Sequence, residues 1–358
     1  LTRACRAFGA LDDTLAVAAI TRHAPCLAGN SGEKLRLWVR LSDGREVALF
    51  AKFSRCLADP FRDRRRHELE AEVRLARLSR HPAFPVTVPQ AWFADFEQAS
   101  GTGLLIAAAV PFGEGGVLPP RAKCMDRELP DHGLEYYRAT LSALARLAAA
   151  YRSGALSPEV EALFPYDRAL ARADIPVPWS RAELVAKAEA LRDFIGMAPQ
   201  LFPSAVADPA FLARIVPEAE LFHIDEVEIR GFLHADPDYV ALAHWNTNLD
   251  NAWFWRDRAG TMQCGLPDWG MVRAMHVALG IWGGMSAADP ELWDLHGQAL
   301  LAHFAKAYEA HGGPRIDPAR LRLHLDLSVA AVSLAKMPDL PALIAARPPQ
   351  AAPASGAH

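Results

Sequence analysis

Residues 243–270 hold the side chains with the clearest chemical potential, in the segment AHWNTNLDNAWFWRDRAGTMQCGLPDWG. Asn251 stands 7 residues after His244, and Asp268 follows 17 residues after Asn251. A turn at Asp257–Gly260 predicts a short β-hairpin between them, which would bring an amide and a carboxylate together. Oxygen donors of this kind are the ligands that Mg²⁺ prefers, often shared with substrate phosphates. The segment therefore predicts a site for magnesium and phosphate.

A lysine in an apolar strand offers a matching positive charge. Leu35–Leu41 alternates apolar with polar or aromatic residues, Ser42–Gly44 forms a turn, and Val47–Phe53 is more apolar. This pattern predicts a β-hairpin, with Lys52 near the end of its second strand. Such a lysine could neutralise phosphates, in which case catalysis would consist of positioning and electrostatic stabilisation. The alternative is an ordinary lysine at a strand end.

The order of these motifs resembles the aminoglycoside phosphotransferase and choline kinase-like families, which share the protein-kinase-like fold. Their catalytic loop has the pattern H-x-D-x-x-x-x-N, followed after a hairpin by an aspartate in an I-D-W or D-F-G context. Here His244 and Asn251 occupy the first and last positions, and Asp268 precedes Trp269-Gly270. The resemblance covers about residues 24–310.

The resemblance implies an α+β, two-lobed protein-kinase-like fold. A small, β-rich N-lobe would span about 1–112 and a larger helical C-lobe 113–345. The small, Pro-rich composition after Arg347 separately predicts a disordered tail at 346–358. A hinge would lie at 104–116, with backbone groups near Ala109–Phe112 facing an adenine ring.

The same resemblance implies ATP and Mg²⁺ as cofactors and assigns the nucleotide contacts. Lys52 would contact the α- and β-phosphates and pair with Glu72, or with Glu70, on the helix that follows. A solvated helix face is the alternative for both glutamates. The turn before the first strand would cover the phosphates with Gly29, Ser31 and Gly32, or would only reverse the chain.

The catalytic loop departs from the family pattern at one position. Asn251 and Asp268 would hold Mg²⁺ and His244 would brace the loop, but Asn246 stands where the family has its catalytic aspartate. An amide can orient a substrate hydroxyl but cannot accept its proton at neutral pH. A positioned base contributes roughly 10²–10⁴-fold to rate. Asp250 is the nearest substitute, and Asp236 and Asp238 are more distant ones.

These residues leave two main functional hypotheses and a third possibility. One is transfer of the ATP γ-phosphoryl group to a hydroxyl of a small-molecule acceptor. The other is a pseudokinase that binds a nucleotide or another ligand without turnover. Nucleotidyl transfer on the same fold is the third. Acidic residues of the helical part could attract a cationic acceptor or form a solvated face: Glu159, Glu161, Asp167, Glu218, Glu220, Asp225, Glu226 and Glu228.

Composition excludes several other classes of protein. The formal net charge of −4 gives no basic excess to neutralise nucleic-acid phosphates, so the basic run Arg62–Arg66 is interpreted as a solvated helix start. The 5 cysteines contain no C-x-x-C pair, which disfavours disulfides and zinc and favours the reducing cytoplasm. No apolar run approaches the roughly 18 residues of a membrane span. H-E-x-x-H and G-x-S-x-G motifs do not occur, which disfavours zinc hydrolases and α/β-hydrolases.

Hydrophobic periodicity and breakers predict the remaining elements. We expect strands at 86–93 and 103–110, a hairpin within 239–272, and helices at 2–20, 61–80, 134–153, 181–194, 209–230 and 291–311.

Overall fold

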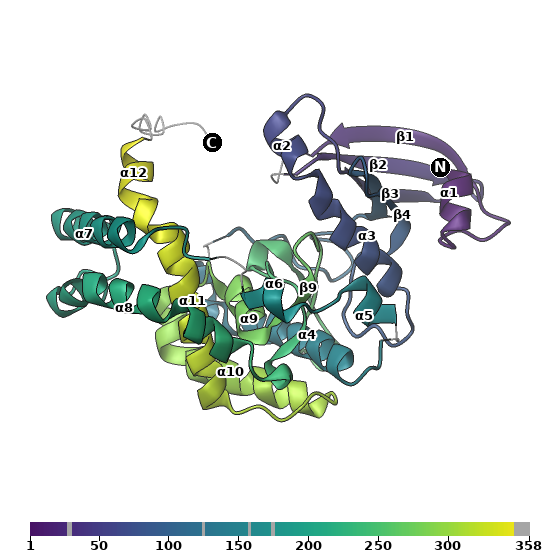
Figure 1. Ribbon diagram of the computed structural model, residues 1–358. Helices are drawn as coiled ribbons and strands as arrows, with labels where there is room; N and C mark the ends of the chain where they lie inside the picture. Colours follow the sequence, from purple (N-terminus) through teal and green to yellow (C-terminus); the bar gives the residue numbers. More distant parts are fainter. Residues whose placement is uncertain (27–30, 124–125, 157–158, 173–175, 347–358) are drawn as a thin grey trace. The chain divides into compact units, whose positions relative to one another are not determined.

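The computed structural model describes residues 1–26, 31–123, 126–156, 159–172 and 176–346. It is a mixed α+β structure, with a five-stranded antiparallel sheet in its N-terminal part and a helical C-terminal part (Figure 1). The chain divides into two compact units, Leu1–Tyr166 with Asp238–Leu321 and Asp167–Pro237 with Arg322–His358. The expected lobe limits at 112 and 345 stay a prediction.

The N-terminal part of the first unit is built on one sheet with the strand order β1-β2-β3-β5-β4. The predicted hairpin is β2–β3, in which Lys34 lies opposite Lys52. The elements are α1 (Thr2–Ala7), β1 (Val17–Pro25), β2 (Glu33–Leu41), β3 (Glu46–Phe53), α2 (Pro60–Arg64), η1 (Arg66–Glu68), α3 (Leu69–Leu78), β4 (Ala91–Glu97) and β5 (Thr102–Ala108).

The expected leading helix over 2–20 is wrong beyond its first turns. Helix α1 ends at Ala7, and Val17–Pro25 forms the edge strand β1, which pairs with β2. Alanine-rich stretches fit either periodicity, and pairing with β2 decides for the strand. The strand expected at 86–93 begins only at Ala91, whereas β5 begins one residue before its expected range of 103–110 and ends at Ala108.

The two faces of the sheet bury different layers. Leu49 and Ala51 of β3 pack with Val39 in a cluster on one face. Alternation along a strand turns Lys52 to the opposite face. There α3 packs against β4 and β5 through Leu69, among others (Figure 1). The sheet therefore directs a buried lysine toward helix α3.

The rest of the first unit surrounds α4, whose alanine- and leucine-rich surface is almost wholly buried. Helix α10 packs along α4. Two short strand pairs, β6–β9 and β7–β8, flank the loops that hold His244, Asn251 and Asp268. The elements are η2 (Asp126–Glu128), η3 (Pro130–Gly133), α4 (Leu134–Arg152), α5 (Glu159–Leu163), η5 (Pro237–Tyr239), β6 (Val240–Ala243), η6 (Leu249–Asn251), β7 (Trp253–Arg256), β8 (Met262–Gly265), β9 (Arg273–His276), α9 (Val277–Met285) and α10 (Pro290–Ala310).

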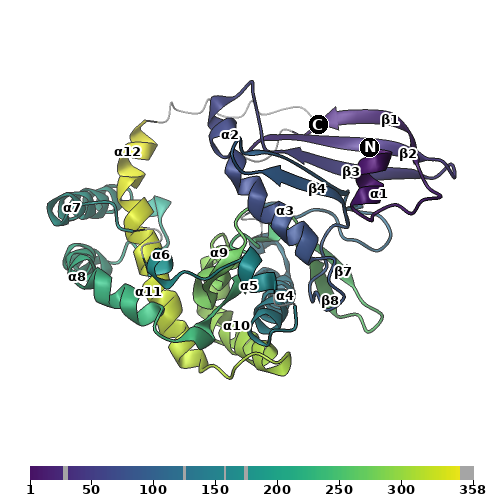
Figure 2. The ribbon, with the colours of Figure 1, turned by 45° about the vertical axis from the view of Figure 1, so that its right-hand side comes forward.

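The second unit is helical. Helices α7 and α8 lie side by side (Figure 2), and a cluster that includes Leu184 and Phe222 packs between them and α11. A capping box of Ser180 and Glu183 begins α7, and Asp208 caps α8. The elements are α6 (Arg168–Arg172), α7 (Arg181–Met197), η4 (Pro199–Leu201), α8 (Pro209–Leu233), α11 (Pro318–Lys336), η7 (Met337–Asp339) and α12 (Leu340–Ala345).

One helical stretch, Pro318–Ile344, is long and apolar enough to cross a membrane by length and composition alone. Lys336 and Asp339 interrupt its apolar run in the sequence, whereas an 18-residue window within the stretch has a mean hydropathy of 1.4. A single stretch of this kind is weak evidence, because core helices have the same composition.

Candidate functional site

Lys52 joins three segments that are far apart in the sequence. Its Nζ donates to Asp268 Oδ1 at 2.7 Å and also forms a hydrogen-bonded ion pair with Glu72 of α3. Lys52 and Glu72 are 5% and 4% exposed, whereas the Asp268 side chain is 47% exposed. The structure therefore brings together the predicted lysine, its predicted partner and the predicted metal ligand, with Asp268 as the member that faces solvent.

Glu72, rather than Glu70, is the partner of Lys52. Glu70 forms an ion pair with Arg74 and accepts a hydrogen bond from Gln98 Nε2 at 2.6 Å. The two glutamates are two positions apart on a helix, so they cannot share one face. The face that packs on the sheet carries Glu72.

Burial and charge act against each other in this cluster. Burial alone would lower the pKa of Lys52, but the carboxylates of Glu72 and Asp268 raise that pKa above its ordinary value. Burial raises the pKa of Glu72 to about 7 despite the nearby Lys52 ammonium. Burial would also raise the pKa of Asp268, but Lys52 lowers it below its ordinary value. Asp268 thus stays ionised, and Glu72 is the carboxylate that more readily takes a proton.

The turn that carries Asp268 has an unusual backbone. Asp268 has a φ of 57°, in the left-handed region that non-glycine residues rarely adopt. The following Trp269 is buried and donates from its indole nitrogen to Leu266 O at 2.7 Å. At Gly270 an added Cβ would lie 3.1 Å from Glu72 Oε1, so the close packing of this turn on α3 favours glycine there. Strain of this kind gathers at functional sites.

His244 holds the loop of residues 244–251 and the Asp268 turn together. Its Nδ1 accepts a hydrogen bond from the Asn246 backbone at 3.1 Å, and its Nε2 lies 2.8 Å from Pro267 O. A carbonyl only accepts, so the geometry assigns the proton to Nε2. Burial lowers the pKa of His244 to about 4. The residue is therefore a neutral brace, which is the structural role expected for it.

The Asn246 amide is engaged within the loop. Its Oδ1 accepts from Asn248 Nδ2 at 3.0 Å, and its backbone oxygen accepts from Asn251 Nδ2 at 3.1 Å. Asn248 is buried; its Nδ2 also donates to Gly283 O, and its Oδ1 accepts from the Ala287 backbone. Asn248 was not singled out from the sequence, although a second asparagine two residues after Asn246 was the available signal.

Asn251 has a donor set that suits a hard cation. Its Nδ2 donates to the backbone oxygen of Asn246, so its Oδ1 is the side-chain atom left to accept or to ligate. Together with the ionised Asp268 carboxylate it offers oxygen ligands of the type Mg²⁺ takes, with phosphates and water completing the shell. Among the described residues no group of three or more His, Cys, Asp or Glu side chains could hold a metal by itself.

The alternative acids occupy other positions. Asp250 is exposed in η6, and Asp238 forms an ion pair with Arg152, with 3.5 Å between Oδ1 and Nη2. Asp236 belongs to the second unit.

Three of the acidic residues that could attract a cationic acceptor form ion pairs with arginine side chains. In the second unit Glu218 pairs with Arg214, and Glu220 pairs with Arg181. Glu226 pairs with Arg230 and accepts from the Val177 backbone. These contacts favour the solvated-face interpretation. The side chains of Glu159 and Glu161 lie outside the described residues.

The phosphate-covering turn is described only in part. Gly29 lies outside the described residues, and Ser31 is partly exposed. Gly32 has a φ of 55°, and an added Cβ would lie 1.8 Å from Phe53 O. Only glycine therefore fits where this turn enters β2. At the expected hinge, the Ala109 and Phe112 N–H groups donate to Ala48 O and Val110 O, which leaves the adenine contact a prediction.

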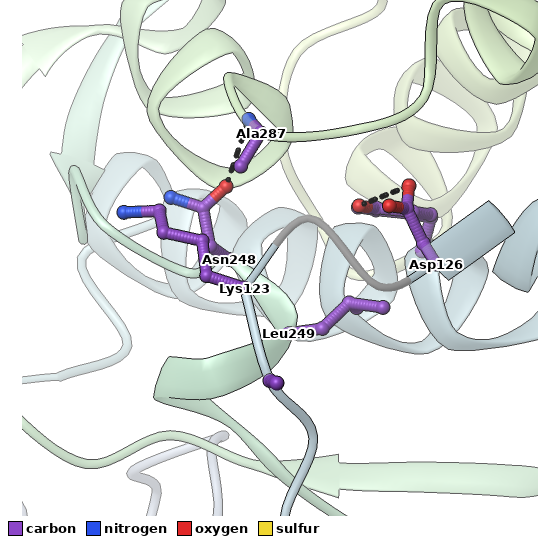
Figure 3. A pocket seen from close by; sticks show the side chains of 7 residues that line it. Lys123, Asp126, Asn248, Leu249 and Ala287 are labelled. Carbon is purple, nitrogen blue, oxygen red and sulfur yellow. Dashed lines mark hydrogen bonds between the residues drawn. The ribbon is translucent and has the colours of Figure 1, made fainter. Parts of the chain in front are cut away.

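A shallow pocket of about 160 Å³, open solvent included, lies beside the loop of residues 244–251. Figure 3 shows Lys123 and Asn248 on the left, Asp126 on the right, Leu249 below them and Ala287 above. Asp126 is buried and accepts from Tyr137 Oη at 3.0 Å and from the Asp289 backbone at 2.7 Å. Asn248 links this pocket directly to the amide of Asn246.

Comparisons with known proteins give structural similarity at low sequence identity. No protein-family model matches the chain, and no curated protein matches it. A macrolide 2'-phosphotransferase type I structure is similar with a TM-score of 0.45 and 16% identity, over 97% of this chain and 91% of that one.

Two further solved structures are similar at comparable levels. The GDP and kanamycin complex of APH(2")-IIIa has a TM-score of 0.44 and 13% identity, over 91% of this chain and 88% of that one. Macrolide 2'-phosphotransferase MphH from Brachybacterium faecium, an apoenzyme, has a TM-score of 0.40 and 17% identity, over 92% and 93%. Macrolide and aminoglycoside phosphotransferases are thus among the proteins that this chain resembles in structure.

Proposed function

We propose that this protein is an ATP-dependent phosphotransferase that acts on a hydroxyl group of a small molecule. The observation that carries the proposal is the bridge that Lys52 makes between Glu72 and Asp268. A buried lysine held between two carboxylates from distant segments is costly to assemble for stability alone. In phosphoryl transfer the same set has a use, since a lysine and a metal-binding aspartate position the phosphates.

Each residue has a defined task in this proposal. Lys52, oriented by Glu72, binds the α- and β-phosphates. Asp268 and the Asn251 amide oxygen hold Mg²⁺, which neutralises phosphate charge when bound. The pocket at Asn248 receives the acceptor, and Asn246 orients its hydroxyl group. His244 holds the loop that carries Asn246 and the turn that carries Asp268 in place relative to each other.

A second candidate function is supported by the amide of Asn246. Its oxygen already accepts a hydrogen bond from Asn248, and an amide does not take up a proton at neutral pH. A loop of this composition suits a pseudokinase that binds a nucleotide or another ligand with little or no turnover. The two functions share the nucleotide site and differ in the acceptor step.

Calorimetric titration with Mg-ATP tests the site that both functions need. We expect the wild type to bind, Asp268→Ala to lose affinity by about tenfold or more, and Asp250→Ala to bind as the wild type does. Asp250 is the matched control because it is an exposed aspartate of the same loop region. Equal affinity of wild type and Asp268→Ala, or no binding by the wild type, would contradict the proposed site. Release of ADP with an acceptor panel then separates transferase from pseudokinase.

A further inference from the structure

Two side-chain nitrogens of the partly buried Arg62 are left unpaired by the residues that the structure describes. Its Nε and Nη2 atoms are buried and have no hydrogen-bond partner among the described residues. Buried polar atoms are normally hydrogen-bonded, and an unpaired buried cation is costly. Such an exception calls for a physical reason, and a missing anionic ligand is one.

The place of Arg62 is fixed by the docking of α2. Asp59 caps this short helix by accepting from the Phe61 and Arg62 backbones, and Arg62 O accepts from Gly32 N at 3.4 Å. Helix α2 therefore lies at the end of the sheet where β2 begins and β3 ends (Figure 1). That end also holds Lys52.

A second lysine lies next to Lys52 on the same side of the sheet. Lys34 and Lys52 are direct partners across β2 and β3, so their side chains leave the sheet on one face. Burial lowers the pKa of Lys34, and the positive charges of Lys52 and Arg62 lower it further, while Asp268 and Glu72 act in the opposite direction. Lys34 is thus close enough to interact with each of the other four charged groups.

Within this group three cations, Lys34, Lys52 and Arg62, lie near two carboxylates, Glu72 and Asp268. We propose that Arg62 and Lys34 bind the polyphosphate chain of a nucleoside triphosphate beside Lys52, so that part of its recognition does not need a metal ion. This inference rests on the proposed function and deepens it. A guanidinium suits the task because its planar fork matches phosphate oxygens.

The test compares Arg62→Met with Arg64→Met, a neighbouring exposed arginine of the same helix. The probes are inorganic tripolyphosphate without Mg²⁺ and Mg-ATP, both followed by calorimetry and by the ligand-induced rise in melting temperature. We expect Arg62→Met to weaken tripolyphosphate binding about tenfold or more and Arg64→Met to leave it unchanged. Arg62→Lys should recover part of the affinity because it keeps the charge.

The melting temperature without ligand gives an independent readout. Removing two buried nitrogens that have no hydrogen-bond partner should leave the melting temperature of free Arg62→Met equal to or above that of the wild type. A clear decrease would show that Arg62 serves the fold and would overturn the inference.

The binding outcomes separate this inference from the proposed function. Wild-type binding of tripolyphosphate that is equal in Arg62→Met overturns the inference alone. Arg62-dependent binding of tripolyphosphate, with Mg-ATP bound no more tightly and no effect of Asp268→Ala, supports the inference and overturns the proposed function. No binding of either probe overturns both.

Discussion

Lys52 Nζ and Asp268 Oδ1 lie 2.7 Å apart although 216 positions separate the two residues in the chain. The contact connects strand β3 with the turn that follows β8. Because Lys52 also pairs with Glu72, this single ammonium group orients a sheet, a helix and a loop at once. The nucleotide site proposed here therefore depends on a tertiary contact that can be probed without any ligand.

Replacing Lys52 by methionine should destabilise the protein in a pH-dependent way. Lys52→Met leaves Glu72 buried without its cation, so we expect the free energy of unfolding at pH 8 to fall by about 3 kcal/mol. Burial raises the pKa of Glu72 above its ordinary value of 4.5 when the protein folds. A group whose pKa is raised by folding lowers the free energy of unfolding as pH rises through that pKa. The loss should therefore be smaller at pH 5, as measured by urea unfolding.

The double variant Lys52→Met/Glu72→Leu is the control for this prediction. It removes both buried charges, so it should recover much of the stability that Lys52→Met loses at pH 8. An equal loss for the single variant at pH 5 and pH 8 would show that the charge of Glu72 is not the cause.

His244 should remain neutral well below the pH at which a free histidine takes up a proton. Burial lowers its pKa from 6.5 to about 4, so the folded chain binds fewer protons than the unfolded chain between these values. Stability from this residue is present above pH 6.5 and decreases by about 2 kcal/mol between pH 7 and pH 5. An NMR titration of the imidazole nitrogens, with exposed His23 as internal reference, should show neutral His244 protonated at Nε2. An imidazole of His244 that titrates near pH 6.5 would contradict its role as a buried, neutral residue that holds the two segments by hydrogen bonds.

Asn246→Asp should raise phosphoryl transfer if the proposed site is catalytic. An aspartate can keep the hydrogen bond from Asn248 Nδ2 and can also accept the acceptor's proton. We expect a gain of roughly 10²–10⁴-fold over the wild type, measured as acceptor-dependent ADP release. Asp250→Asn is the comparison: Asp250 is exposed in η6, so we expect no change, and a fall in transfer would instead identify Asp250 as the substitute base. An acceptor that the wild type phosphorylates fast, with no gain in Asn246→Asp, would exclude the pseudokinase hypothesis.

Gly283 should be intolerant of a side chain because α9 packs tightly on the loop of residues 244–251. An added Cβ would lie 2.1 Å from the Trp245 backbone oxygen, so Gly283→Ala should destabilise the protein by about 2 kcal/mol. Gly196, also helical, has no neighbour within 4 Å of an added Cβ. Gly196→Ala should therefore leave stability unchanged or raise it by up to about 1 kcal/mol. Thermal unfolding of both variants checks the pair, and similar melting temperatures would contradict the close packing.

The sequence by itself determined the elements that depend on local pattern. Alternation predicted β2 and β3, and apolar periodicity with breakers predicted α4, α7, α8 and α10 within a few residues. Motif spacing was enough to place Asn251 and Asp268 on either side of the β7–β8 hairpin. These features follow from the 2-residue and 3.6-residue repeats and from turn chemistry, all of which are short-range.

Only the tertiary structure decided which side chains meet. The docking of α3 selected Glu72 over Glu70, and pairing with β2 turned residues 17–25 into a strand. The hydrogen bonds of Asn248 and the buried guanidinium atoms of Arg62 likewise depend on segments remote in sequence. Burial, partner choice and pKa are properties of the packed environment, and a local repeat fixes the face of an element but not what that face will contact.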